Sequence, residues 1–346
     1  MKKLLVILLS LLLVISLGAC GKKEDPAPSG DGGDEQKLSG SVMLYSSMSE
    51  VVLQALQARF MEVYPDIQFD YVQAGSGKIA TKLTTELQAN SVECDIVWLA
   101  DASEFVEYKN AGNLVPYESP YAATVDPMFR DADNTYIGAR AVLTGFVYSP
   151  TKIGDGLVPK SWKELLDPSL KDEILMTDAG ASGSMKTWLY ALVNHPDYGW
   201  EFFEQLKANG LVLESGTTAT HNKVADGSYK VGVGVDFVAK NLIAEGANVA
   251  WQNVEQDAIA YYSPIAIVKG CPNEELAKVL YDFIMNPDEG QKVLADNNIT
   301  PVQPSTPIPD GMYSVDWITS HAVKVDVAKM AAESEEMLAK YDSIFK

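Results

Sequence analysis

Strand-like and helix-like segments alternate along most of this 346-residue chain, which leaves few folds open to it. In the first third, the predicted strands are 41–45, 67–72 and 94–99, and the predicted helices are 51–63, 79–89 and a third that ends near 110. The first helix stops at Tyr64-Pro65, because proline cannot continue a helix. A β-α-β-α-β-α order predicts a mainly parallel sheet that is covered by helices.

The alternation continues through the rest of the chain. The predicted strands are 142–148, 174–176, 211–214, 230–235 and 258–268, and the predicted helices are 185–194, 202–208, 274–285, 291–296 and one that ends near 227. The tail, 315–346, is also predicted to be helical. The part after the N-terminal segment has about 300 residues, which is enough for two lobes of ordinary domain size.

The N-terminal segment has the features of a lipoprotein signal. Two lysines are followed by an almost unbroken apolar run over 4–17, which has about the length of a signal-peptide core. The run ends in Leu17-Gly18-Ala19-Cys20, which resembles a bacterial lipobox. This resemblance implies a signal peptide over 1–19 and acylation of Cys20, where two or three acyl chains would make a firm membrane tether. The alternative is an ordinary N-terminal membrane anchor.

A polar segment follows the cysteine. Residues 20–38 are mostly Gly, Pro, Asp, Glu and Lys without an apolar run, so they cannot bury enough surface to offset their ordering entropy. We expect a disordered tether there, with the folded part beginning near Ser39. The folded part would then lie outside the cytoplasmic membrane, attached to it through the lipid on Cys20.

Charge and composition exclude some classes of partner. The chain is 47% hydrophobic and 21% charged, as in ordinary globular proteins, and its formal net charge is −20. This acidity argues against nucleic-acid binding and against a basic membrane-surface patch. It does not exclude an anionic ligand, because a buried pocket sets its own local field.

Cysteines and histidines give no metal site. Apart from Cys20, the cysteines are Cys94 and Cys271, and they are predicted either to pair or to stay free as buried thiols in a compartment that permits disulfides. Three scattered histidines show no zinc-type spacing with cysteine. No metal and no cofactor are therefore predicted.

Several short motifs occur in a characteristic order. They are Leu44-Tyr45-Ser46-Ser47, Tyr71-Val72-Gln73-Ala74-Gly75-Ser76-Gly77, Asp95-Ile96-Val97-Trp98, Pro159-Lys160-Ser161-Trp162, Ala179-Gly180-Ala181-Ser182-Gly183-Ser184 and Asn286-Pro287-Asp288-Glu289-Gly290-Gln291. Together they resemble the family 1 extracellular solute-binding proteins, which include binders of ferric iron, thiamine, 2-aminoethylphosphonate and hexose phosphate. The resemblance covers most of the chain after the tether.

The resemblance implies an α/β fold of the periplasmic-binding-protein type II, in which two α/β lobes are joined by a hinge of two strands. We place the hinge strands at about 140–148 and 258–268. The first lobe would then consist of 39–140 and 266–346, and the second of 141–265. The helical tail is expected to pack back on the first lobe.

Four loops that are rich in Ser, Thr and Gly follow predicted strands and precede helices. The candidate ligand-binding residues in them are Ser46, Ser47, Gly75, Ser76, Gly77, Ser182, Gly183, Ser184, Thr217 and Thr218. Ligands of α/β proteins bind outside the carboxyl ends of strands, where N–H groups and the helix dipole favour anions. Each loop alone is explained by helix capping or a tight turn. Four loops that converge on one cleft favour an oxyanion site.

Other candidates lie at strand ends and in the hinge. Asp101 and Asp236 each end an apolar strand, where a carboxylate could accept from a hydroxyl or an ammonium group; helix capping is the alternative. His221 follows the threonine loop and could donate to a phosphate, or lie at the surface. Tyr45 could stack on a ligand. Thr144 and Tyr262 are candidates from the hinge strands, since at most one of Tyr261 and Tyr262 can face the ligand.

Two other ligands fit the residues less well. Gly75-Ser76-Gly77-Lys78 fails the nucleotide-binding pattern, because Val72 and Ile79 stand where glycine and a hydroxyl residue are required. Ferric binders of the family carry tyrosines after the strand that ends here at Asp236, and Phe237 stands at that point instead.

The prediction is therefore the substrate-binding lipoprotein of an ABC importer, a monomer that captures an organophosphate or phosphonate by lobe closure and then docks on a permease. Suitable solutes would be a sugar phosphate or 2-aminoethylphosphonate. We find no catalytic motif and expect no enzyme. The alternatives are a ferric-iron binding protein, a ligand-sensing lipoprotein and a secreted phosphohydrolase.

Overall fold

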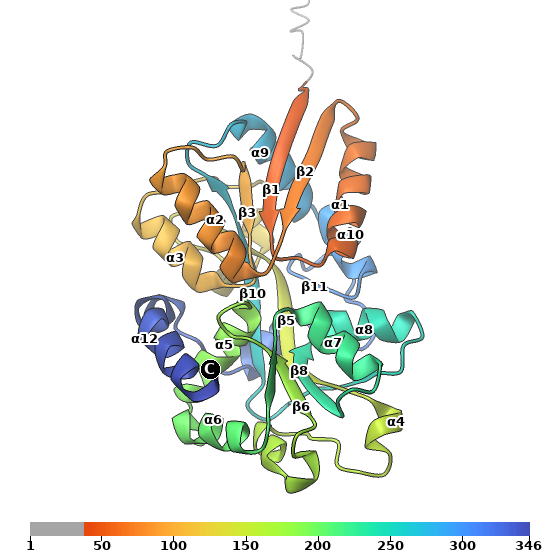
Figure 1. Cartoon of the computed structure of the whole chain (residues 1–346). Helices are drawn as coiled ribbons and strands as arrows, with labels where there is room; N and C mark the ends of the chain where they lie inside the picture. Colours follow the sequence, from red (N-terminus) through yellow and green to blue (C-terminus); the bar gives the residue numbers. More distant parts are fainter. Residues whose placement is uncertain (1–37) are drawn as a thin grey trace, which may run out of the picture. The chain divides into compact units, whose positions relative to one another are not determined.

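The computed structural model describes residues 38–346 (Figure 1). The predicted signal peptide, Cys20 and nearly all of the predicted tether lie outside the described residues. The first strand begins at Gly40, next to the expected start of the folded part. No helix within 38–346 has the length and apolar character needed to cross a membrane.

Eleven strands of the described part form one continuous sheet with the order β2-β1-β3-β10-β5-β8-β6-β7, onto which three short strands pair at the side. The strands of the main path are β1 (Gly40–Ser46), β2 (Ile67–Gln73), β3 (Ile96–Trp98), β5 (Ile137–Tyr148), β6 (Ile174–Thr177), β7 (Val212–Glu214), β8 (Val231–Val235) and β10 (Ile259–Val268). The short ones are β4 (Leu114–Val115), β9 (Ala250–Gln252) and β11 (Thr300–Pro301).

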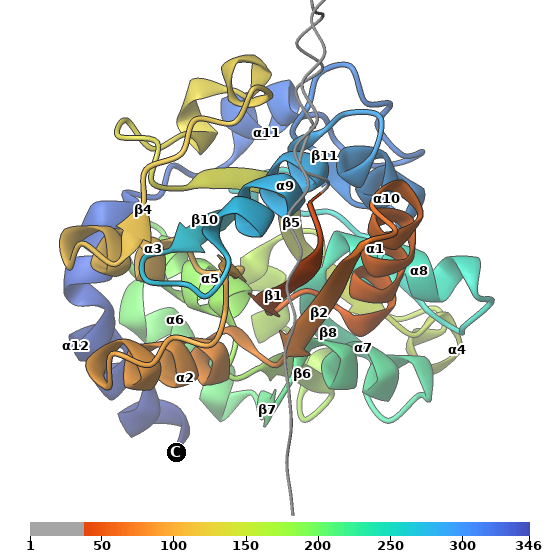
Figure 2. The same cartoon turned by 90° about the horizontal axis from the view of Figure 1, so that it is seen from above.

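The two long strands connect the two halves of this sheet. β1 pairs in parallel with β2 and β3, and β6 pairs in parallel with β7 and β8. Between these groups, β5 and β10 run antiparallel, with Thr144 opposite Ile259 and Ile137 opposite Ile265. They lie near the centre of the molecule when it is viewed from above (Figure 2). The predicted parallel pairing holds within each half, and the connecting strands are antiparallel.

Each half of the sheet has its own hydrophobic core. One core is built around Leu44, Phe60 and Phe283, and the other around Trp162 and Trp188. A smaller core, which includes Cys94, covers the other face of β1 and β3. Cys271 packs at the margin of the first core, and both thiols are free. The predicted fold class, two α/β lobes joined by two strands, is confirmed.

Helices cover both faces of the sheet (Figure 1). Around the first half lie α1 (Glu50–Val63), α2 (Ser76–Gln88), α3 (Ala102–Asn110), α9 (Glu274–Met285), α10 (Gly290–Asp296) and α11 (Val315–His321). Around the second lie α4 (Pro150–Ile153), α5 (Gly183–Val193), α6 (Gly199–Ala208), α7 (Thr217–Ala225), α8 (Asp236–Ala244) and α12 (Val327–Phe345). The sequence interpretation missed α8, because it treated Asp236 only as the end of a strand.

The C-terminal helix differs from the expectation. α11 contributes Ile318 to the first core, whereas α12 contributes Met330, Met337, Tyr341 and Phe345 to the second. These apolar residues recur at helical spacing and share a core with Phe202 and Phe203 of α6. α12 lies near α6 in the molecule (Figure 1). α12 also contacts α3 of the first lobe, so the tail packs on both lobes instead of the first lobe alone.

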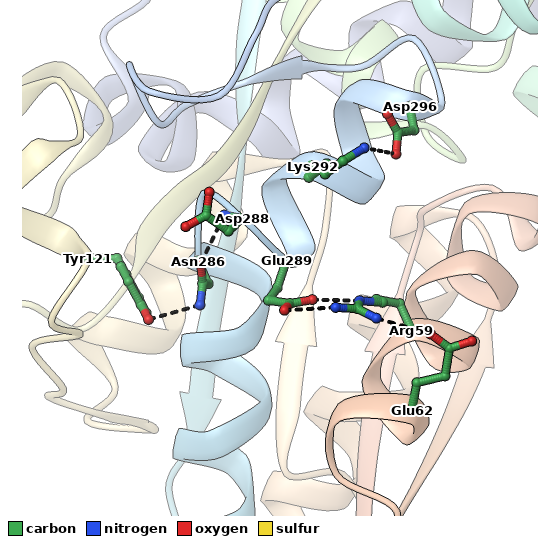
Figure 3. Close-up of polar contacts among 8 residues, drawn as sticks. All are labelled: Arg59, Glu62, Tyr121, Asn286, Asp288, Glu289, Lys292 and Asp296. Atoms are coloured by element: carbon green, nitrogen blue, oxygen red, sulfur yellow. Dashed lines mark hydrogen bonds and ion pairs between the residues drawn. The ribbon is translucent and has the colours of Figure 1, made fainter.

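The motif Asn286–Gln291 forms the turn between α9 and α10 (Figure 3). Asn286 donates from Nδ2 to the Tyr121 hydroxyl at 2.9 Å and accepts from the Asp288 N–H at 2.9 Å. Glu289 holds the Arg59 guanidinium through two contacts of 2.6 and 2.9 Å, which ties the turn to α1. This motif, which carried part of the family resemblance, thus has a structural role in the first lobe.

Gln291 is the buried centre of the same turn. Its Nε2 donates to the carbonyl of Ala139 at 2.8 Å and to that of Ile284 at 3.0 Å. Its Oε1 accepts from the N–H of Val302 at 2.8 Å. One side chain therefore satisfies backbone groups of β5, of α9 and of the segment after β11.

We predict that Gln291→Leu lowers the free energy of unfolding by about 2–4 kcal/mol, because it leaves buried backbone groups without partners. Urea denaturation of the chain from residue 38 onward measures the change. Lys292→Ala is the matched control, since its pair with Asp296 is exposed and such pairs contribute little. A Leu variant as stable as this control would contradict the assignment.

Candidate functional site

A cavity of about 390 Å³ lies where the loops of both lobes meet the hinge strands. Its walls come from the ends of β1, β2, β6, β7 and β8, and its floor includes residues of β5 and β10. The volume falls in the range of small-molecule sites in proteins. The position agrees with the rule that α/β sheets bind ligands outside the carboxyl ends of their strands.

All four predicted loops contribute to this cavity. The predicted residues that line it are Ser47, Gly75, Ser76, Ser182, Ser184, Thr217 and Thr218. Three helices, α2, α5 and α7, begin at these loops, and their N-cap residues are Gly75, Ser182 and Gly216. Two of these N-caps are glycines, which have no capping side chain, and Ser182 makes no capping bond, so N-capping at these positions does not occupy the loop hydroxyls. Helix N-termini of this kind favour negative charge.

Arg140 is the main residue that sequence reasoning missed. It lies in β5, lines the cavity and is only 2% exposed. Its Nε and Nη1 atoms have no hydrogen-bond partner among residues 38–346. The guanidinium carbon lies 4.9 Å from the centre of the Phe237 ring. Burial lowers the pKa of Arg140, against the opposing influence of Tyr261 and Asp236. One feature of the sequence indicated a functional role for Arg140, which is the single charged residue in a largely apolar strand.

The charged residues of the cavity wall are all cationic. Lys78, near the start of α2, joins Arg140 there, and the lining contains no Asp, Glu or His. Gln73, Thr177 and Ser215, which were also not predicted, add polar groups that can donate or accept. The cavity therefore combines two positive side chains with hydroxyls and helix N-termini, a set of groups that suits an anion carrying hydroxyls.

Asp236 does not line the cavity, contrary to the prediction. It is the first residue of α8 and 3% exposed, and its carboxylate accepts from the N–H groups of Leu143 at 3.1 Å and Phe237 at 2.8 Å. Burial raises its pKa to about 7, although these hydrogen bonds and Arg140 act in the opposite direction. Its role here is to hold the start of α8 against β5.

Four further candidates point into the protein instead. The Tyr45 hydroxyl donates to Glu86 at 2.9 Å, and the Ser46 hydroxyl donates to the carbonyl of Trp98 at 3.0 Å. His221 is fully buried between the carbonyl of Thr217 and the backbone of Val235, and burial lowers its pKa. Thr144 is also fully buried, and its hydroxyl has no partner within the described chain. None of the four lines the cavity.

The hinge strand presents Tyr261 to the cavity and not Tyr262. Tyr262 packs beside Phe129, with ring centres 5.3 Å apart, on the other side of the strand. Only one tyrosine of the pair lines this cavity, as strand alternation requires. The choice of Tyr262 was wrong, because a buried antiparallel strand is apolar on both faces and gives no sign of which face lines the site.

Glycines allow the lobes to approach closely beside the cavity. A Cβ added to Gly75 would lie 2.7 Å from the carbonyl oxygen of Ala181, and one on Gly77 would lie 2.5 Å from that of Gly180. A Cβ on Gly183 would lie 2.6 Å from the backbone nitrogen of Asp101. Gly77 and Gly183 are thus closure contacts between the lobes instead of members of the cavity wall.

Asp101 is a helix cap, as the alternative interpretation held. Its Oδ1 accepts from the N–H of Ser103 at 3.0 Å and from the hydroxyl of that residue at 2.6 Å. Its Oδ2 lies 2.9 Å from Nζ of Lys186, which comes from the second lobe. The carboxylate is therefore fully occupied and does not line the cavity.

Comparisons with known proteins agree with this geometry. Residues 95–317 match the family described as bacterial extracellular solute-binding protein. Over 236 residues the chain is 25% identical to a Salmonella paratyphi A protein named as a candidate 2-aminoethylphosphonate-binding periplasmic protein, covering 64% of this chain and 66% of that one.

Two solved structures share the fold at low sequence identity. The periplasmic binding protein AfuA from Actinobacillus pleuropneumoniae, with exogenous fructose-6-phosphate bound, has a TM-score of 0.79 and 22% identity, and the match covers 89% of this chain and 99% of that one. Iron-bound HitA from Pseudomonas aeruginosa has a TM-score of 0.75 and 18% identity, with 87% and 99% covered. These structures carry different ligands, so the shared fold alone does not select one.

The raised pKa of Asp236 predicts a pH-dependent stability difference. A carboxyl whose pKa is raised from 3.8 to about 7 on folding contributes stability that is fully present below about pH 4 and is lost as the pH rises through about 7. Asp236→Asn cannot ionise, so the stability of this variant relative to wild type should increase between pH 5 and pH 8.

Urea denaturation at both pH values measures this difference. The lost acceptor of Asn adds only a pH-independent offset, and Asp316→Asn at the exposed surface should follow wild type at both pH values. Parallel pH profiles for wild type and Asp236→Asn would disprove the prediction.

Proposed function

This chain belongs to the bacterial extracellular solute-binding proteins, and from that premise we propose that it is the substrate-binding component of an ABC importer for a small organic anion. The anionic group is a phosphate or phosphonate. The observation that carries the proposal is Arg140, a buried guanidinium at the cavity whose Nε and Nη1 have no partner among residues 38–346.

Burying charged donors without hydrogen-bond acceptors is costly, and proteins normally satisfy such groups. Arg140 has a planar set of donors that matches the oxygens of phosphate, and such charge-assisted hydrogen bonds are among the stronger ones. A bound oxyanion would supply the missing acceptors. The three helix N-termini and the hydroxyls around the cavity would donate to the remaining oxygens.

The rest of the ligand is inferred from the absence of acidic groups in the lining. An ammonium group would need a carboxylate, and neither Asp236 nor Asp101 reaches the cavity wall. Gln73, Thr177 and Ser215 instead suit hydroxyl groups. We therefore favour a phosphorylated polyol, such as a sugar phosphate, over the 2-aminoethylphosphonate named for the Salmonella relative. The AfuA structure holds a ligand of this type.

Ferric iron is the second candidate within the family, as in iron-bound HitA. Fe(III) is a hard cation that requires several anionic oxygen or nitrogen ligands. The cavity lining contains one tyrosine, Tyr261, and two cationic side chains that would repel a metal ion. The lining therefore favours an anion.

In the proposed role, the protein binds its ligand and catalyses no reaction on it. The hydroxyls of Ser182 and Ser184 lie 2.9 Å apart in the wall, but the lining offers them no His, Asp or Glu as a base. We further propose that the protein acts as a monomer outside the cytoplasmic membrane, is held there by lipid on Cys20 and delivers its ligand to a permease.

Thermal unfolding of the chain from residue 38 onward, after removal of carried-over ligand, tests the function against a panel of solutes. The panel holds sugar phosphates, 2-aminoethylphosphonate, inorganic phosphate, ferric citrate, thiamine and the corresponding unphosphorylated sugars. A ligand at 100 times its dissociation constant adds about 2.7 kcal/mol of stability. We expect a shift with a sugar phosphate and none with its unphosphorylated sugar.

Arg140→Met should abolish this shift, because it removes the donors that are proposed to hold the oxyanion. Arg59→Met, at the exposed pair with Glu289, is the control that keeps the shift. A shift with ferric citrate alone would overturn the anion assignment. Turnover of the bound phosphate ester would show an enzyme.

A further inference from the structure

An ion-pair cluster joins the two lobes next to the ligand cavity. Lys186 of α5, from the second lobe, places Nζ 2.9 Å from Oδ2 of Asp101 and 3.4 Å from Oε1 of Glu104. Both acidic residues belong to the first lobe, at the cap and in the first turn of α3. The Lys186 side chain is 7% exposed and that of Asp101 is 4% exposed. None of the three residues lines the cavity.

The cluster lies at one of the close backbone contacts between the lobes. Gly183, one turn before Lys186, packs directly on the backbone of Ala100 and Asp101, and any side chain there would clash. The start of α5 is therefore seated against the start of α3. Lys186 can reach Asp101 and Glu104 only while this contact exists.

Burial makes the cluster sensitive to the loss of one member. Taking charges out of water is costly, and the cost is offset only when opposite charges meet with good geometry. Asp101 is the closer partner of Lys186, at 2.9 Å against 3.4 Å for Glu104, and burial together with the neighbouring Asp101 raises the pKa of Glu104. Without the ammonium group, two acidic side chains would face each other in a closed contact, whereas separated lobes would leave both in water.

We propose that Lys186 is a positioning residue for ligand capture. Its ion pairs with Asp101 and Glu104 hold the lobes in the arrangement that encloses the cavity, and it does so without touching the ligand. The residue thereby sets how long a captured solute stays bound. The consequence for ligand release rests on the proposed binding function, whereas the effect on lobe contact does not.

The test combines binding kinetics with small-angle X-ray scattering of the purified protein, with fructose 6-phosphate as the probe. For Lys186→Met we expect the dissociation rate to rise about tenfold with little change in the association rate, as for loss of one partner of a buried charge pair. The radius of gyration should increase, because the lobes separate. Lys186→Arg, which keeps the charge, should restore both values toward wild type.

Two further variants separate a positioning role from a structural one. Lys278→Met removes a lysine whose ion pairs within residues 38–346 are with Glu274 and Glu275 of its own helix, and it should leave scattering and kinetics unchanged. Gly183→Ala blocks the same lobe contact sterically and should reproduce the larger radius of gyration.

Scattering curves for Lys186→Met that match wild type with and without the probe would overturn the proposal. So would a loss of unfolding stability in this variant without any change in scattering. If wild type binds neither fructose 6-phosphate nor any other sugar phosphate of the panel, the proposed ligand class fails, and the scattering of Lys186→Met and Gly183→Ala still decides whether the contact holds the lobes together.

Discussion

The antiparallel pairing of β5 with β10 is the interaction on which the rest of the structure depends. The first part of β5 pairs with β10 and its last part pairs with β8, so one strand belongs to both halves of the sheet. Every residue of β5 before Tyr148 is buried. The backbone N–H and C=O groups of this strand must therefore find their hydrogen-bond partners mainly in the neighbouring strands. Because Arg140 and Tyr261 lie on these two strands, the same pairing places the floor of the cavity between the lobes.

The energetic cost of the site is concentrated at this floor. Arg140 and Asp236 are buried charged groups, and burial shifts the pKa of each toward its neutral form. The fold offsets such costs elsewhere, through an aromatic cluster around Trp162 and Trp188 and through the fully bonded Gln291. The residues of the proposed binding site and the residues that stabilise the fold therefore lie in different parts of the protein. This is expected where a binding site holds polar groups that are satisfied only by a ligand.

Sequence reasoning recovered the features that depend on local pattern. Period-two and helical spacing located most strands and helices, and the small polar residues at strand ends marked the loops that meet at the cavity. It could not find features that depend on tertiary contact. An apolar strand does not reveal that Arg140 faces a cavity, nor that Tyr261 and not Tyr262 does. Asp236 resembled a strand end because its helix follows without any linker. The amphipathic stripe of α12 indicated burial, but not against which lobe.

The placement of α12 also changes the mechanics of the hinge. Because α11 contributes to the first core and α12 to the second, the chain crosses between the lobes a third time, near Ala322 to Asp326. The N–H of Val323 in this crossing bonds the carbonyl of Ala258 at 2.8 Å, just before β10. Two adjacent strands alone would permit both bending and twisting. A third connection that is hydrogen-bonded at the base of β10 adds a constraint on the hinge that two strands alone would lack, and it lies on the chain between helices that contribute to different cores.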